Sequence, residues 1–160
     1  MSLPDRRQFL TLLAALPLAG CGFTPVYAPG AAGEKLRGRV AVQAPATRDE
    51  FALVSRLESR LGQAPSPAYD LGYTLALGRI SGGISPANET TRYTLRGTLT
   101  YSLTDRATAT RIAGGTLRNF TSWSATGSTV AAISADEAAS ARLMQILADD
   151  LVTRLTAELS

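Results

Sequence analysis

Histidine is absent from this sequence of 160 residues, and cysteine and lysine each occur once. Without histidine, the chain has no Ser-His-Asp triad, no Cys-His dyad and no imidazole-ligated zinc. The single cysteine excludes a disulfide within the chain and any metal site built from several thiolates. The only lysine, Lys35, has Ala32 three positions before it, so a Ser-x-x-Lys catalytic pair is excluded as well. We therefore expect a non-enzymatic protein with no metal site and no cofactor.

The chain also carries little net charge. It has 16 Lys and Arg residues against 13 Asp and Glu residues, which gives a formal charge of +3 at pH 7. A balance this close to neutral does not favour nucleic acid as a partner, and we expect none. Apolar residues make up 45% of the chain and charged residues 18%, which indicates one folded domain rather than a disordered or polytopic membrane protein.

The first 20 residues have the pattern of a secretory signal peptide. Arg6 and Arg7 precede an apolar run over residues 9–19, which would form about 16 Å of helix and is too short to span a bilayer. Arg6-Arg7-Gln8-Phe9-Leu10 also resembles the twin-arginine export motif, although paired arginines are common in ordinary signals. We predict a signal peptide over residues 1–20 of the lipoprotein type and leave both export routes open.

The apolar run ends in Leu18-Ala19-Gly20-Cys21, which resembles the lipobox of bacterial lipoproteins. In that family the cysteine thiol receives a diacylglyceryl group, and the chain is cleaved just before it. We predict lipidation of Cys21 and attachment to the membrane through this anchor; the alternative is an ordinary buried thiol. The residue after the cysteine is Gly22. An Asp at this position would resemble an inner-membrane retention signal, so glycine favours the outer membrane. Residues 21–38, rich in Gly, Ala and Pro, are predicted to be the lipidated N-terminus and a tether.

The periodicity of the remaining residues predicts a folded domain over residues 39–160. Alternating apolar residues indicate strands, and apolar residues spaced three or four apart indicate helices. The predicted order is β-α-β-β-β-α. An antiparallel-rich four-stranded sheet covered by two helices would make an α+β two-layer sandwich. The expected strands lie at 39–44, 69–78, 92–103 and 111–123. Residues 81–83 and 85–88 are expected to bracket a turn or a disordered hairpin tip.

Two capping boxes mark the expected helix starts, one at Thr47–Glu50 and one at Ser134–Glu137. The first helix would bury a stripe made of Phe51, Val54, Leu57 and Leu61. The second would run for about 25 residues along a stripe of leucines at four-residue spacing. These leucines are Leu143, Leu147, Leu151, Leu155 and Leu159.

The mature chain resembles the LptE family of lipopolysaccharide-assembly lipoproteins in its alphaproteobacterial form. The resemblance is carried by the start at residues 21–27 (Cys-Gly-Phe-Thr-Pro-Val-Tyr), by Phe120-Thr121-Ser122-Trp123, and by the long C-terminal helix that includes Ala148-Asp149-Asp150-Leu151. It implies a non-enzymatic protein that sits in the lumen of the outer-membrane β-barrel LptD. It also implies a role in assembling that barrel and in passing lipopolysaccharide to the cell surface, and lipopolysaccharide as a binding partner.

Arginines on the polar side of the predicted strands are the candidate ligand-binding residues. Arg92 and Arg96 are four positions apart on one strand and therefore project from one face, opposite the apolar residues. Their guanidinium groups suit bidentate contact with the phosphates of lipid A or with carboxylates of a barrel wall. The alternative is a solvated face whose charges discourage edge pairing. Arg118 is a further candidate, as are Arg79 and Arg111, although their register cannot be read from the sequence.

Two functions from different classes of complex fit these features. The first is a lipid-anchored plug and assembly scaffold for an LptD-like barrel. The second is an accessory lipoprotein of another periplasmic transporter or secretion complex. Dependence on the barrel partner separates the two.

Overall fold

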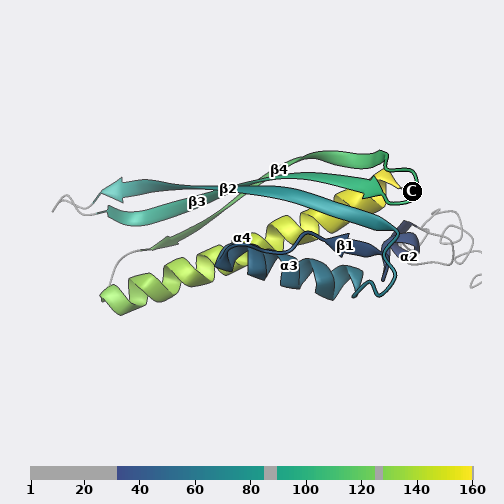
Figure 1. Ribbon diagram of the computed structural model, residues 1–160. Helices are drawn as coiled ribbons and strands as arrows, with labels where there is room; N and C mark the ends of the chain where they lie inside the picture. The colour runs from purple at the N-terminus through teal and green to yellow at the C-terminus, as the bar shows by residue number, and fades with distance from the viewer. Residues whose placement is uncertain (1–31, 85–89, 125–127, 160) are drawn as a thin grey trace, which may run out of the picture.

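The computed structural model describes residues 32–84, 90–124 and 128–159. It is a two-layer α+β fold in which a four-stranded sheet lies over two helices (Figure 1). This confirms the predicted fold class, with one short helix added at the start. The elements are α2 (Ala32–Leu36), β1 (Val40–Val42), α3 (Arg48–Leu61), β2 (Tyr69–Ile84), β3 (Thr90–Asp105), β4 (Arg111–Ser124) and α4 (Thr129–Glu158).

The sheet has the strand order β1-β2-β3-β4 and is mostly antiparallel. β1 pairs parallel to β2, but only along residues 40–42 against 69–71. β2 and β3 form a hairpin of two 16-residue strands whose register is unbroken from Tyr69↔Asp105 to Ile84↔Thr90. β2 continues through residues 81–83, so the chain does not yet turn there, and the rest of the expected hairpin tip, residues 85–89, lies outside the described residues.

Alternation along the strands divides the sheet into a buried face and an open face. The buried face packs on α3 and α4 through large apolar side chains: Leu71, Tyr73, Leu95, Leu99, Tyr101 and Leu103. Gly97 lies among them, and a Cβ atom at this position would come within 2.8 Å of Leu147 Cδ1. The absent side chain lets α4 approach β3 closely, so the leucine stripe of α4 lies directly against the sheet.

α3 begins as predicted but buries a different stripe. The Thr47 side chain accepts from the Glu50 N–H, and the Glu50 carboxylate accepts from the Thr47 N–H, so the capping box is confirmed. Phe51, however, is 66% exposed, whereas Leu53 is fully buried. At about 100° per residue, Phe51 lies about 100° from the middle of the buried face and Leu53 only about 60°. The prediction of Phe51 as a core residue is therefore wrong.

α4 is longer than predicted because it starts earlier. Its 30 residues begin at Thr129, where the Ser128 side chain accepts from the Ala131 N–H. Ser134 is thus inside the helix, and the second predicted capping box is wrong. No glycine or proline interrupts residues 129–158, so the helix continues through the pattern that resembles a start. Asp136 and Glu137 form ion pairs with Arg79 and Arg48 instead of capping.

The folded domain begins before the predicted boundary at residue 39. Leu36 of α2 is fully buried in the core, and the Gly38 N–H donates to the Leu61 carbonyl at 2.7 Å. Residues 32–38 therefore pack on the domain and are not a tether. The rest of that prediction, including Cys21, lies outside the described residues. Within the described residues, none of the helices combines the length and apolar character needed to cross a membrane.

Tyr73 has a buried hydroxyl without a hydrogen-bond partner among the described residues. We expect Tyr73→Phe to raise the free energy of unfolding by about 1 kcal/mol, because an unsatisfied buried polar atom is removed. Tyr101→Phe is the matched control: its hydroxyl donates to Glu158 Oε1 at 3.2 Å, so this change should not stabilise the protein. Urea unfolding at neutral pH measures both. A destabilised Tyr73→Phe would contradict the prediction.

The same tyrosine makes stability sensitive to alkaline pH. Burial, and to a smaller extent Glu50, raises the pKa of the Tyr73 phenol above its usual value near 10. The unfolded chain therefore releases this proton at a lower pH than the folded chain does. This contribution to stability is present below pH 10 and is lost as the pH rises above it, so Tyr73→Phe should flatten the alkaline decline.

Candidate ligand-binding face

Three of the predicted arginines, Arg92, Arg96 and Arg118, lie on the open face of the sheet, the side away from α3 and α4. Arg92 and Arg96 on β3 are both exposed, and Arg118 on β4 lies opposite Thr98 of β3. Arg96 and Arg118 are diagonal neighbours across the β3–β4 ladder, with Cα atoms about 7 to 8 Å apart. Arg92 lies about 13 Å further along β3. The three guanidinium groups therefore form a line on one surface.

These three arginines are not neutralised, unlike six other arginines of the described residues. Within the described residues, none of Arg92, Arg96 and Arg118 makes an ion pair. The strand positions of the open face carry one carboxylate, Asp70, and Arg106 binds it with contacts of 2.6 to 2.9 Å. The open face therefore carries unbalanced positive charge.

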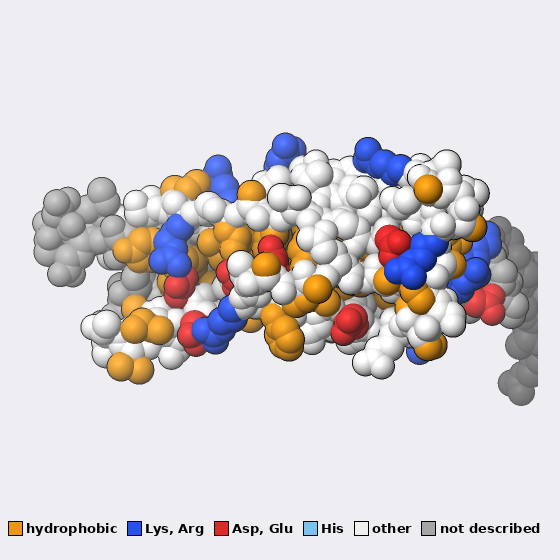
Figure 2. All heavy atoms as spheres, viewed as in Figure 1, with side chains coloured by type: hydrophobic (Ala, Val, Ile, Leu, Met, Phe, Trp, Pro, Cys, Tyr) orange, Lys and Arg blue, Asp and Glu red, His pale blue; other side chains and the backbone are white. Residues whose placement is uncertain are grey.

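Figure 2 shows this asymmetry on the side of the molecule that is in view. Blue Lys and Arg side chains stand along the upper edge, on the side of the sheet that faces away from the helices. The red Asp and Glu side chains lie lower, beside the sheet edge and over the helices. A ligand with negative charge is thus attracted to the open face.

Phe120 is the functional candidate that the sequence reasoning missed. It lies opposite Arg96 in the β3–β4 ladder and is 62% exposed. Together with Arg96 and Arg118 it borders a shallow hollow of about 330 Å³. Alternation along β4 is the signal that was available, because Trp123 and Thr121 face the core and Phe120 must then face outward. The hollow combines two cations with one exposed aromatic ring.

Arg79 does not belong to this face. It lies on the helical side of β2, where its guanidinium group binds Asp136 at 2.7 to 2.9 Å and stands 5.4 Å from the Trp123 ring centre. Trp123 in turn stacks on Tyr93. Arg111 is exposed, and its Nε donates to the Ala113 carbonyl at 3.3 Å. Of the two further candidates, Arg79 is therefore a structural residue that connects β2 to α4.

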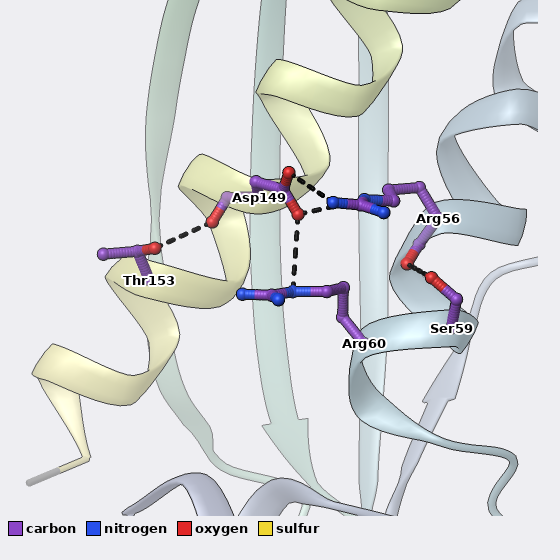
Figure 3. Close-up of polar contacts among 5 residues, drawn as sticks. All are labelled: Arg56, Ser59, Arg60, Asp149 and Thr153. Carbon is purple, nitrogen blue, oxygen red and sulfur yellow. Dashed lines mark hydrogen bonds and ion pairs between the residues drawn. The ribbon is translucent and has the colours of Figure 1, made fainter. Parts of the chain in front are cut away.

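The neighbouring carboxylates of α4 also have structural roles. Figure 3 shows Asp149 between two arginines of α3: Arg56 donates two hydrogen bonds of 2.8 and 3.1 Å, and Arg60 lies 3.4 Å away. Asp150 points elsewhere and accepts from the Asn119 side chain. The carboxylate of Asp149 raises the pKa of the Arg56 guanidinium, mainly through their hydrogen bonds. The two acids diverge, as expected for adjacent helical positions.

Comparison with known proteins places this fold. A family model described as "LptE: Lipopolysaccharide-assembly" matches residues 38–155. No curated protein matches the chain. Among solved structures, a candidate lipoprotein from Caulobacter crescentus CB15 superposes with a TM-score of 0.65 at 20% identity, over 79% of this chain and 93% of that one.

Two further solved structures share the fold. Rare lipoprotein B from Shewanella oneidensis has a TM-score of 0.58 at 11% identity and covers 74% of this chain and 92% of its own. A minor lipoprotein from Acinetobacter baumannii has a TM-score of 0.53 at 23% identity, over 75% and 91%. At these identities the likeness concerns the fold, and the family match carries the assignment. Because that match spans most of the domain, this chain belongs to the LptE family of lipopolysaccharide-assembly proteins.

Proposed function

We propose that this protein is a lipid-anchored plug and assembly scaffold of an LptD-like outer-membrane β-barrel, and that its open face binds lipopolysaccharide directly. The family match supports a role in lipopolysaccharide assembly. The observation that carries the finer proposal is the line of three arginines on the open face, which make no ion pair with any described residue.

The chemistry of this face suits a phosphorylated lipid. Arginine stays charged at every physiological pH, and its planar donors match phosphate oxygens in pairs. Phe120 offers an exposed apolar surface beside Arg96 and Arg118, next to which the sugar rings or acyl carbons of the lipid can lie. In the described part of the chain this face has no nucleophile poised beside a base, so its proposed role is binding and guidance.

Reversing the charge of the open face should weaken lipopolysaccharide binding at least tenfold. Each charge-assisted hydrogen bond contributes about 1.5 to 3 kcal/mol, and 1.4 kcal/mol corresponds to a factor of ten. We propose Arg96→Glu/Arg118→Glu, with Arg92→Glu added as a third change. The side chains are exposed, so the melting temperature should change little. Binding is measured with purified lipopolysaccharide by surface plasmon resonance.

Arg37→Glu/Arg142→Glu is the matched control for the double variant. It changes the net charge by the same amount at two exposed arginines outside the open face. Its affinity for lipopolysaccharide should stay within about twofold of the original protein, since only local contacts with phosphate are specific. Equal losses in both double variants would mean that net charge alone attracts the lipid, and the open face would then not be the binding site.

Anchoring through Cys21 is the second part of the proposal. We expect Cys21→Ala to release the protein from the outer membrane into the periplasm, because the acyl chains contribute about 0.8 kcal/mol per buried CH₂ group. The melting temperature of each variant reports whether the domain still folds. Fractionation of cell envelopes measures this, with Cys21→Ser as a second variant. Retention of both variants in the outer membrane would refute lipid anchoring.

The barrel partner is tested by affinity purification from detergent-solubilised outer membranes. Recovery of a large β-barrel protein at one-to-one stoichiometry would support the plug. Recovery of inner-membrane transporter subunits instead would favour the accessory lipoprotein of another complex.

A further inference from the structure

β2 has a long edge that is not paired within the described part of the chain. β1 covers only residues 69–71 and then leaves the sheet, whereas β2 continues to Ile84 (Figure 1). We call residues 74–83 the β2 free edge. All of its residues from Ala76 to Gly83 are exposed, Leu77 and Ile80 among them.

Contacts at the end of β1 show which backbone groups point outward. The Leu71 carbonyl accepts from the Gln43 N–H at 2.9 Å, and the Tyr73 N–H donates to Gln43 Oε1 at 3.3 Å. Residue 71 and residue 73 therefore direct their backbone groups away from β3. The β2–β3 register has no shift over this stretch, so strand alternation directs the N–H and C=O groups of Leu75, Leu77 and Arg79 outward as well. Only another extended backbone matches such a row of donors and acceptors.

A hollow of about 540 Å³ lies beside the β2 free edge, between the sheet and the two helices. Its apolar lining comes from several elements: Ala52, Leu77, Leu95, Ile133 and Ala141. Hydrophobic side chains are visible between the two layers in Figure 2. A strand added next to β2 would direct every second side chain toward the helices, into this hollow.

Charges around the hollow indicate the composition of the added strand. Two ion pairs, Arg48–Glu137 and Arg79–Asp136, neutralise four of the five charged groups. The fifth is the Asp49 carboxylate, which accepts a hydrogen bond from the Ser140 hydroxyl and makes no ion pair among the described residues. The rim thus carries one excess negative charge, which is complementary to a basic side chain.

The opposite edge of the sheet is protected against such pairing. The pairing of β4 with β3 shifts register between Leu103↔Ala113 and Thr104↔Arg111, and β4 carries Arg111 and Arg118. Its Phe120 N–H already donates to the Asn119 side chain at 3.0 Å. Irregular pairing and charge are the features by which edge strands avoid partners. The β2 free edge has an unbroken register, and its one charged residue, Arg79, is turned toward α4.

We propose that the β2 free edge is a docking site for an extended segment of a partner protein. The segment adds to the sheet as a further strand, places alternate apolar side chains in the hollow, and sets a basic residue near Asp49. This site is separate from the arginines of the open face and does not depend on lipid binding.

The test uses a defined probe and the full chain. The probe is a synthetic peptide of about nine residues in which Thr and Val alternate around a central Arg. Amide hydrogen exchange is followed residue by residue by NMR, with and without the peptide. We expect exchange to slow at least tenfold at the outward N–H groups of Leu75, Leu77 and Arg79, with little change at Ala76 and Gly78, which are bonded to β3.

Two controls separate strand addition from other binding. A twin peptide with alternate backbone nitrogens methylated keeps the side chains but loses its donors, so it should protect none of these amides. Leu77→Pro removes one outward N–H at a position where an edge strand tolerates proline, and Leu77→Ala removes only the side chain. We expect Leu77→Pro to weaken peptide binding about tenfold more than Leu77→Ala does.

Several results would overturn the proposal. The methylated peptide could bind as tightly as the unmethylated one. The peptide could slow amide exchange in β4 instead of β2, or slow it nowhere even in excess. Protection that appears without peptide and grows with protein concentration would assign the edge to a second copy of the chain. Protection in the dilute monomer without peptide would mean that the chain covers its own edge.

Discussion

Leu53→Ala should lower the free energy of unfolding by about 3 kcal/mol, while Phe51→Ala should change it by less than about 0.5 kcal/mol. Both residues lie on α3, but Leu53 is fully buried and Phe51 is 66% exposed. Removing a buried leucine side chain costs the transfer free energy of the lost carbons and also leaves a cavity. Truncating an exposed phenylalanine loses little transfer free energy and leaves no cavity.

Urea unfolding monitored by circular dichroism measures this difference. For a domain of this size, 3 kcal/mol corresponds to a fall in melting temperature of about 10 °C. Both substitutions are in α3 and both introduce alanine, so they differ little in their effect on helix propensity. A larger loss for Phe51→Ala than for Leu53→Ala would show that the sequence-based stripe is correct and the observed packing of α3 is not.

Gly97→Val and Leu147→Ala should each destabilise the protein, and their effects should not add. A Cβ atom at Gly97 would lie 2.8 Å from Leu147 Cδ1 and 3.2 Å from Leu143 Cδ2, so the valine overpacks the core at a cost of about 2 kcal/mol. Leu147 is fully buried, and its truncation should cost about 3 kcal/mol. In the double variant, the valine occupies space that the leucine has left.

The double-mutant cycle gives the coupling between the two sites. We expect the double variant to be more stable than the sum of the single losses by at least about 1 kcal/mol. Gly78→Val is the control for the change of glycine to valine, because a Cβ atom at Gly78 meets no atom within 4 Å. Additive losses would indicate that α4 does not press on β3 at this position.

Much of the fold follows from periodicity in the sequence. The alternation in residues 92–103 correctly separates the buried face of β3 from the open face, because a strand turns successive side chains to opposite sides. The leucines of α4 recur at helical spacing, and four of the five are fully buried. The same alternation is sufficient to place Arg92 and Arg96 on one exposed face.

The boundaries of helices and of the domain are harder to predict from the sequence, because a local pattern typical of a boundary can also occur inside an element. Ser134–Glu137 has the composition of a capping box, yet α4 starts at Thr129 because no residue between the two positions breaks a helix. The small and polar residues of α2 are typical of a flexible tether, and local composition does not distinguish a tether from a short helix that packs on the domain. Leu36 is buried through contacts with core residues that are distant in sequence, so its burial depends on the tertiary structure.

The sequence by itself determined the order of the four strands and the two long helices, which face of β3 is apolar, and that no histidine-dependent chemistry is available. These are local properties, set by the periods of the backbone and by the residue types present. The tertiary structure alone decided which arginines are neutralised. Arg79 is paired with Asp136, 57 residues away, and Arg56 with Asp149, 93 residues away, whereas Arg96 and Arg118 meet no acid among the described residues. Ion pairing depends on distance in space, which local periodicity does not encode.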